Sequence, residues 1–191
     1  MRNFMKLLFA GFIMLGAFFV ISTIDQASAK TIKSAKSYML DTKYKSVTYY
    51  STSLLCKNSH TSTLKYAGTK NGSRFWNCRG NLSNPSFGFV QQVQNNTYEI
   101  WVIDTGARIA SLKFPAKKGN VIKEDWYGDI YTSKIISTNA KVKTRAGTFK
   151  NTIVVKQGNI KTYIAKGKGL VLIKEGNKKQ FELVKLAKVK K

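Results

Sequence analysis

Acidic residues, cysteine, histidine and proline are all scarce in this chain of 191 residues. Nine Asp and Glu stand against 33 Lys and Arg, so the formal net charge is +24. That imbalance excludes the near-neutral surface of an ordinary enzyme and favours an anionic partner: an envelope polymer, lipid headgroups or nucleic acid. One His and two Cys do not supply the paired ligands of a zinc site, so no metal and no cofactor is expected. Two Pro and fourteen Gly exclude collagen-like and low-complexity chains.

Long apolar runs are also scarce, and the one that is present lies at the N-terminus. Arg2 and Lys6 precede an apolar run over residues 7–21, and Ala27-Ser28-Ala29 supplies the small residues of a peptidase site. A membrane-spanning helix needs about 20 apolar residues. Residues 1–29 are therefore predicted to be a cleaved signal peptide, with an uncleaved anchor as the alternative. The mature protein is expected to be secreted, to have no transmembrane segment, and to be retained at the cell wall.

The positive charge belongs to the predicted mature chain. Removal of Arg2, Lys6 and Asp25 with residues 1–29 leaves 31 basic and 8 acidic residues, a net charge of +23. Of the basic residues, 27 are Lys and four are Arg. Arg suits bidentate recognition of bases and phosphates, whereas Lys is a hydrated point charge that suits diffuse attraction. Anionic cell-wall polymer or lipid headgroups are therefore the predicted partners, and nucleic acid is less favoured.

A hydrophobic content of 43% provides enough apolar material for a core. Segments rich in Val, Ile, Thr and aromatic residues alternate with turn pairs such as Gly158-Asn159 and Gly176-Asn177, a pattern typical of strands and tight hairpins. The predicted strands are residues 46–56, 62–67, 73–78, 87–94, 97–104, 108–114, 131–137, 140–144, 147–156, 160–165, 169–174 and 179–189. Turns this frequent predict an all-β fold: an antiparallel sandwich, an open barrel or a strongly curved sheet.

The mature chain shows no break in composition, so residues 46–191 are predicted to form a single β-rich domain. Residues 30–45 have no clean hydrophobic period and are predicted to be a flexible leader. In residues 97–104 both alternating faces carry apolar side chains. Such a strand is buried on both sides or lines a groove.

Cys56 and Cys78 are the only cysteines. An even number in an exported chain favours a disulfide, which would stabilise the fold by about 3 kcal/mol through restriction of the unfolded chain. The alternative is a nucleophilic Cys paired with His60. Nothing in the sequence marks the third group that would orient such a pair.

The one acidic cluster of the mature chain lies in residues 123–129. Carboxylates beside aromatic rings suit glycan binding, and they would suit acid/base hydrolysis if Asp104 or Glu99 supplied the second acid. The candidate glycan contacts are Glu124, Asp125, Trp126, Tyr127 and Asp129. A solvated turn that offsets nearby lysines is the alternative. No serine-hydrolase, zinc-protease or phosphate-loop motif is present in the sequence, so no catalytic residue is predicted.

Residues 142–175 carry a motif of specific residues at fixed spacing. The matching residues are Ala146, Gly147, Thr148, Phe149, Tyr163, Ala165, Gly167, Gly169, Leu170 and Val171. This pattern resembles a strand-turn-strand signature of exported β-rich proteins and lipoproteins of Gram-positive bacteria. Those proteins usually have Pro before the Ala-Gly-Thr-Phe segment, where this chain has Arg145. The resemblance implies a β-meander and bacterial export, and it implies no reaction.

These features predict a secreted, basic, non-enzymatic β-protein associated with an anionic bacterial cell envelope. The candidate anionic-surface residues are Lys166, Lys168, Lys174, Lys178 and Lys179. One alternative is a small secreted hydrolase of cell-wall glycan or nucleic acid that uses Glu124, Asp125 or Asp129 with His60. The other is an apolar-groove carrier or inhibitor. An open apolar cavity would favour the carrier, a carboxylate-lined cleft the hydrolase, and a solid core with positive faces the surface binder.

Overall fold

The computed structural model describes residues 31–52, 56, 59–83, 87–126 and 129–189, so the predicted signal peptide lies outside the described residues. A short 3-10 helix, η1 (Lys36–Tyr38), precedes a series of twelve strands. The strands are β1 (Tyr44–Ser51), β2 (Thr61–Lys70), β3 (Ser73–Asn77), β4 (Gly88–Gln94), β5 (Thr97–Val102), β6 (Arg108–Lys113), β7 (Val121–Trp126), β8 (Asp129–Thr144), β9 (Gly147–Gln157), β10 (Ile160–Ala165), β11 (Gly169–Glu175) and β12 (Lys178–Lys188).

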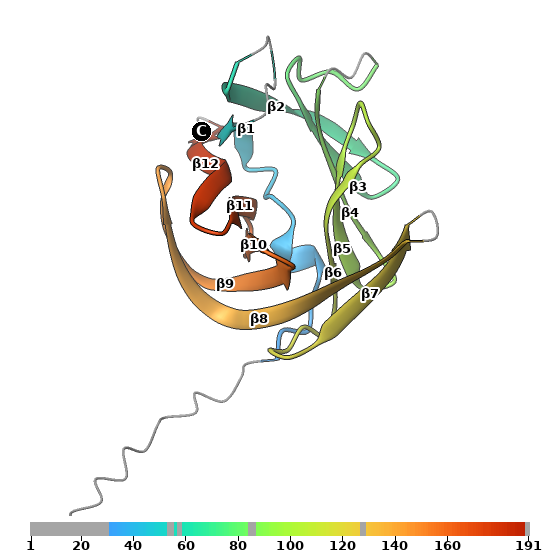
Figure 1. Cartoon of the computed structure of the whole chain (residues 1–191). Coiled ribbons are helices and arrows are strands. Elements are labelled where there is room, and N and C mark those ends of the chain that lie inside the picture. Colours follow the sequence, from blue (N-terminus) through green and yellow to red (C-terminus); the bar gives the residue numbers. More distant parts are fainter. Residues whose placement is uncertain (1–30, 53–55, 57–58, 84–86, 127–128, 190–191) are drawn as a thin grey trace, which may run out of the picture.

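All twelve strands belong to one sheet in the order β6-β5-β4-β3-β2-β1-β12-β11-β10-β9-β8-β7. Every neighbouring pair except β1 and β12 is consecutive in sequence, so the chain is an antiparallel meander whose first and last strands pair with each other. This pairing curves the sheet into a nearly closed barrel with β6 and β7 as its two free edges (Figure 1). The predicted all-β antiparallel fold is confirmed, in the form of an open barrel.

Most strands differ from their predicted bounds by a few residues, and β7 and β8 differ in kind. β8 runs unbroken where two strands, residues 131–137 and 140–144, are predicted, because the strand absorbs Thr138 and Asn139 as a register shift. β7 is absent from the predicted strands because Lys123, Glu124 and Asp125 follow one another within it. Charged side chains are expected on an edge strand, where they discourage pairing with another chain.

The hairpin formed by β8 and β9 bends sharply. Three register shifts interrupt its pairing, and Asn151 in β9 has a left-handed φ of 53°. Irregularities of this kind bend a strand and increase its twist. β8 and β9 therefore curve around β10 and β11, which lie inside the curve (Figure 1). Residues 164–165 and 169–172 of the enclosed strands are buried on both faces, and their least exposed side chains are Ile164, Leu170, Val171 and Leu172.

Side chains fill the interior of the barrel. Tyr49 contacts Phe181 and Phe89, with ring centroids 4.5 and 5.8 Å apart respectively. Tyr98 and Ile100 of β5 are completely buried, whereas the alternating side of this strand is half-buried. Other fully buried residues are Leu64, Trp76, Leu112, Ile135 and Ile153. The interior is thus a packed core, as in other small barrels whose inward side chains meet.

The segment predicted to be a flexible leader, residues 30–45, is packed against the barrel over its described part. Leu40 N donates to Gln91 Oε1 at 2.7 Å, and Gly167 N donates to the Ser37 carbonyl at 2.7 Å. The buried side chains of the segment are Ala35, Tyr38, Met39, Leu40 and Tyr44. These side chains contact the barrel individually. Tyr38 ends η1 and Tyr44 begins β1, while the others lie outside regular elements, so the segment shows no clean period in the sequence.

Leu40→Ala is expected to lower the free energy of unfolding by about 2–5 kcal/mol, because it leaves a cavity in the core. Thr42→Ala, at an exposed position two residues away, is expected to stay within about 0.5 kcal/mol of the wild type. Urea unfolding followed by tryptophan fluorescence measures both changes. Equal stability of the two variants would contradict the packed segment.

Candidate functional site

Cys56 and Cys78 form a disulfide, with their Cα atoms 5.8 Å apart. The bond joins the connection between β1 and β2 to the end of β3. The predicted pairing is confirmed, and it removes Cys56 as a free nucleophile. His60 Nδ1 lies 2.9 Å from the Ser51 carbonyl oxygen, and no described carboxylate forms a hydrogen bond or ion pair with this ring. The structure therefore does not assemble a Cys–His pair with an orienting acid.

The acidic cluster is divided between the two sides of β7. Glu124 lies opposite Tyr131 and Asp125 lies opposite Ile130 in the pairing with β8. Because neighbouring residues of a strand point to opposite faces, the two carboxylates do not face one ligand together. Of the other candidate glycan contacts, Tyr127 lies outside the described residues, as do the side chains of Trp126 and Asp129.

Side chains join the two free edges of the barrel. Arg108 of β6 pairs with Glu124 of β7 at 2.9 Å and with Glu99 of β5 at 3.3 Å. Its guanidinium carbon lies 5.3 Å from the centroid of the Trp101 ring, and Glu99 also accepts a 2.7 Å hydrogen bond from Gln92. The three charged side chains are only 14–23% exposed. Partly desolvated ion pairs thus bridge the seam between β6 and β7, where the sheet has no strand pairing.

A cavity of about 420 Å³ lies at this seam. Its volume is within the ~300–1,000 Å³ of ligand pockets. The lining residues with polar side chains, besides Arg108 and Glu124, are Ser111, Tyr131, Ser133, Gln157 and Thr162. Hydroxyl and amide groups of this kind can bind a small polar molecule. Among the described lining residues Glu124 is the one carboxylate, so the described part of the lining lacks the pair of acids that glycoside hydrolysis requires. It is also not an apolar groove.

Arg108→Ala is expected to lower the free energy of unfolding by about 1–3 kcal/mol, because Glu99 and Glu124 lose charged hydrogen-bond partners in a partly buried place. Arg79→Ala, at an exposed position, serves as the control. Its free energy of unfolding is expected to lie within about 0.5 kcal/mol of the wild-type value. Chemical denaturation measures both. A loss for Arg108→Ala no larger than that of the control would show that the seam does not depend on these ion pairs.

The five predicted surface lysines do not form one cluster. Lys166 and Lys168 lie in the turn between β10 and β11, and the other three, Lys174, Lys178 and Lys179, lie where β11 meets β12. These two places are at opposite ends of β11. Lys168 Nζ donates a hydrogen bond to Tyr44 OH and lies 4.5 Å from the centroid of that ring. Lys168 is therefore engaged within the fold.

The strand registers instead assemble a line of lysines across five strands. Lys134 of β8 lies opposite Lys156 of β9, and Lys156 lies opposite Lys161 of β10. Lys161 lies opposite Lys174 of β11, which lies opposite Lys179 of β12. Residues directly opposite each other share a face of the sheet, with Cβ atoms about 5 Å apart. These five residues are called the lysine row below.

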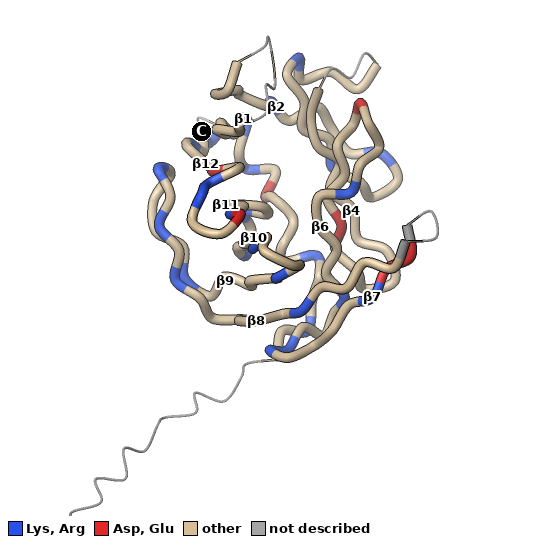
Figure 2. The backbone as a smooth tube through the Cα atoms, viewed as in Figure 1, with Lys and Arg blue, Asp and Glu red and all other residues tan. Residues whose placement is uncertain are grey.

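The first three members of the lysine row are absent from the predicted site. They were missed because the sequence does not state which residues of neighbouring strands lie opposite each other. The turn pairs supplied part of this register. Two-residue hairpins centred on Gly158-Asn159 and Gly176-Asn177 place Lys156 opposite Lys161 and Lys174 near Lys179. The basic positions of β8 to β12 are visible in Figure 2, where acidic positions are few.

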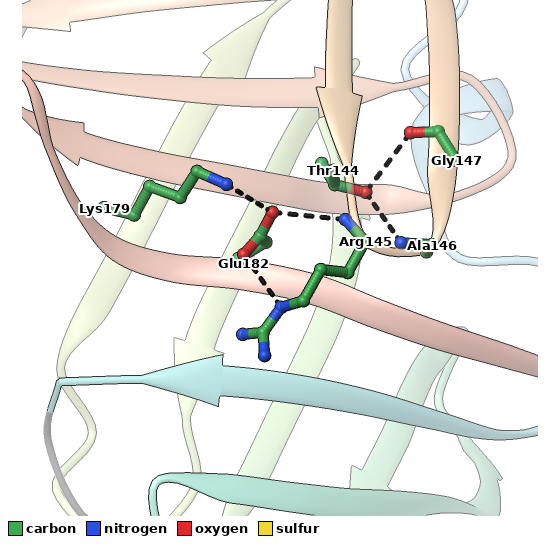
Figure 3. Close-up of polar contacts among 6 residues, drawn as sticks. All are labelled: Thr144, Arg145, Ala146, Gly147, Lys179 and Glu182. Carbon is green, nitrogen blue, oxygen red and sulfur yellow. Dashed lines mark hydrogen bonds and ion pairs between the residues drawn. The ribbon is translucent and has the colours of Figure 1, made fainter.

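A buried carboxylate lies next to one end of the lysine row. Glu182 of β12, with 4% of its side chain exposed, accepts a 2.7 Å hydrogen bond from Lys179 Nζ. It also accepts hydrogen bonds from Arg145 N at 3.1 Å and Arg145 Nε at 3.0 Å (Figure 3). Arg145 is at the turn of the β8–β9 hairpin, and Ala146 N donates to the Leu183 carbonyl at 3.2 Å. Glu182 therefore fastens the tip of this hairpin to β12.

The surroundings of Glu182 favour its charged form. Burial by itself raises the pKa of this carboxyl. The hydrogen bond and charge of Lys179 and the backbone and guanidinium of Arg145 outweigh burial and hold the pKa below its usual value of 4.5. A carboxyl with a lowered pKa in the folded state stabilises the fold above its unfolded pKa. That contribution is lost as the pH falls through the folded value.

Glu182→Gln is expected to lower the free energy of unfolding at pH 7 by about 1–3 kcal/mol, because Arg145 and Lys179 lose an ionic acceptor. The difference from the wild type is expected to shrink as the pH falls below about 4.3, where the unfolded carboxyl becomes protonated. Glu175→Gln, on the exposed end of β11, is the control. Denaturation from pH 3 to pH 7 measures all three proteins, and a difference that does not depend on pH would exclude the charged form as the cause.

The search for metal sites, the search for membrane-spanning helices and the comparisons with known proteins assign no function. The described ranges contain no group of three or more His, Cys, Asp or Glu side chains placed to hold a metal ion. Within the same residues, no helix has the length and apolar character that crossing a bilayer requires. Comparison of the chain with protein-family models, with curated proteins and with solved structures found no match.

Proposed function

We propose that this chain is a secreted, non-enzymatic protein that attaches to an anionic polymer of the bacterial cell envelope through its exposed lysines. The observation that carries the proposal is the unbalanced charge of the described surface. Among the described lysines, ion pairs to carboxylates are formed by Lys43, with Asp41 at 2.8 Å, and by Lys179, with Glu182 at 2.7 Å. The remaining described lysines have no carboxylate partner within the described chain.

Eight acidic residues against 31 basic ones in the predicted mature chain cannot offset this charge, and the fold already uses three of them. Glu99 and Glu124 bind Arg108 at the seam, and Glu182 binds Arg145 and Lys179. The positive field therefore extends from the surface into solvent, where it attracts polyanions over about a Debye length, ~8 Å at physiological salt.

The two alternative functions have less support. The hydrolase requires His60 near Glu124, Asp125 or Asp129, and the described contacts of His60 include no carboxylate. The carrier requires an open apolar groove, whereas the core is packed and the seam cavity combines charged, hydroxyl and amide groups with the apolar Ile109, Ala110 and Val155. A packed core with lysine-rich faces matches the surface binder.

The mature protein, residues 30–191, is expected to sediment with purified Gram-positive cell walls at low salt and to be released as sodium chloride is raised towards 1 M. The reason is that the Debye length falls from about 10 Å at 0.1 M to about 3 Å at 1 M. A salt series of wall pulldowns measures the bound fraction.

Two controls accompany the pulldown. Walls stripped of their phosphate polymers by acid are expected to retain much less protein, and lysine-acetylated protein is expected to bind poorly because its ammonium charges are removed. No retention at low salt, or retention that does not change at high salt, would contradict the proposal.

A further inference from the structure

The lysine row is costly for the sheet in which it lies. Like charges directly opposite each other destabilise a pair of strands, and the row contains four such pairs in succession. Within the described chain no carboxylate pairs with Lys134, Lys156, Lys161 or Lys174, and Glu182 compensates only Lys179. The registers of β8 to β12 therefore collect repulsion that one acidic residue at a position within the row would relieve.

Protection of the sheet against aggregation does not account for the row. Lysines serve that purpose on edge strands, and the edges of this sheet are β6 and β7. The row lies on β8, β9, β10, β11 and β12, each of which has a paired strand on both sides. Solubility also does not require lysines to be aligned, because the surplus charge is spread over the whole chain. A ligand that neutralises the row would explain its alignment.

The shape of the row limits the kind of ligand. Neighbouring strands are about 4.8 Å apart, so the row is about 19 Å long between its end strands. It is one residue wide. On the same face the next positions along the strands are Val154, Tyr163 and Leu172, which are buried or half-buried. A line of cations matches a linear polymer with repeated anionic groups.

Two other polyanionic partners fit the row less well. A membrane presents anionic headgroups in two dimensions, and a single line contacts few of them at a time. Single-stranded nucleic acid is bound by aromatic platforms together with cations, and its phosphates are commonly held by Arg forks. The row is all lysine, and Tyr163 beside it is half-buried. The lysine ammonium groups have no aromatic platform on which bases could stack. They therefore suit a polymer whose phosphates are joined by small polar units in place of nucleosides.

We infer that the lysine row is a binding track for a linear polyol-phosphate polymer, which crosses β8 to β12 at right angles to the strands. This inference rests on the proposed function and extends it by naming the residues and the shape of the ligand. Each bound phosphate lies between the ammonium groups of adjacent lysines and relieves their repulsion. The polymer therefore stabilises the folded protein by the linkage between binding and folding.

The test compares two variants with the same net charge. The row variant carries Lys156→Gln, Lys161→Gln and Lys174→Gln, and the control variant carries Lys45→Gln, Lys70→Gln and Lys113→Gln at exposed positions on β1, β2 and β6. The probe is a synthetic poly(glycerol phosphate) chain, and the measurement is its affinity for the mature protein over a salt series. The row variant is expected to lose at least tenfold in affinity, and the control about twofold.

The salt series also gives the slope of log K against log salt, which reports the number of phosphate contacts. Each phosphate contact contributes about 0.7 to the slope of log K against log salt for a single-stranded polyanion. Loss of three contacts is therefore expected to reduce the slope of the row variant by about 2. The control variant should nearly keep the wild-type slope.

Thermal unfolding without ligand provides an independent readout and a check on folding. The row variant is expected to have a higher Tm than the wild type because its cross-strand repulsion is removed, whereas the control variant should be nearly unchanged. The polymer is expected to raise the Tm of the wild type and of the control, and to leave the Tm of the row variant almost constant. A lower Tm of the ligand-free row variant would overturn the inference.

The remaining outcomes separate this inference from the proposed function. Equal losses of affinity in the two variants would overturn the row as the binding track, while general attachment by charge would stand. No binding of the polymer by the wild type at low salt, combined with no retention on walls, would overturn both. Tighter binding of single-stranded nucleic acid of equal charge, or of anionic vesicles, would overturn the polymer class.

Discussion

The pairing of β1 with β12 is the constraint on which the rest of the structure depends. It joins the first and last strands of a meander, and so moves the free edges of the sheet from the ends of the chain to its middle. The edges, β6 and β7, then face each other across a seam that Arg108, Glu99 and Glu124 bridge. The same closure makes β12 an interior strand, so the lysine row crosses paired strands over its whole length.

The scarcity of acidic residues acquires its meaning from where the fold uses them. Glu99, Glu124 and Glu182 lie in partly or largely buried places and hold strands together through arginine and lysine partners. Each carboxylate that is used in this way is withdrawn from the surface. Most of the lysines that remain outside then form no ion pair with a described carboxylate, and an external polyanion becomes their available partner.

Much of the local structure could be predicted because it depends on neighbouring residues. Alternating apolar side chains and turn pairs such as Gly158-Asn159 gave most strands, and two cysteines allow one intramolecular disulfide. The packed segment around Leu40 could not be predicted, because contacts with distant parts of the chain create it. The edge strand β7 pairs only with the neighbouring β8, and three successive charged residues hid its strand pattern. The seam cavity joins residues of β6 with residues of β7 to β10, and no local pattern connects these.

The order of amino acids was enough to give the sign and amount of charge, the use of lysine in place of arginine, the β class and the two-residue hairpins. The tertiary structure alone decided that β1 pairs with β12, that β6 faces β7, and that Lys134 and Lys174 join the same line as Lys156 and Lys161. The physical reason is that bulges shift these registers, so the residue opposite a given lysine cannot be counted from the turn alone.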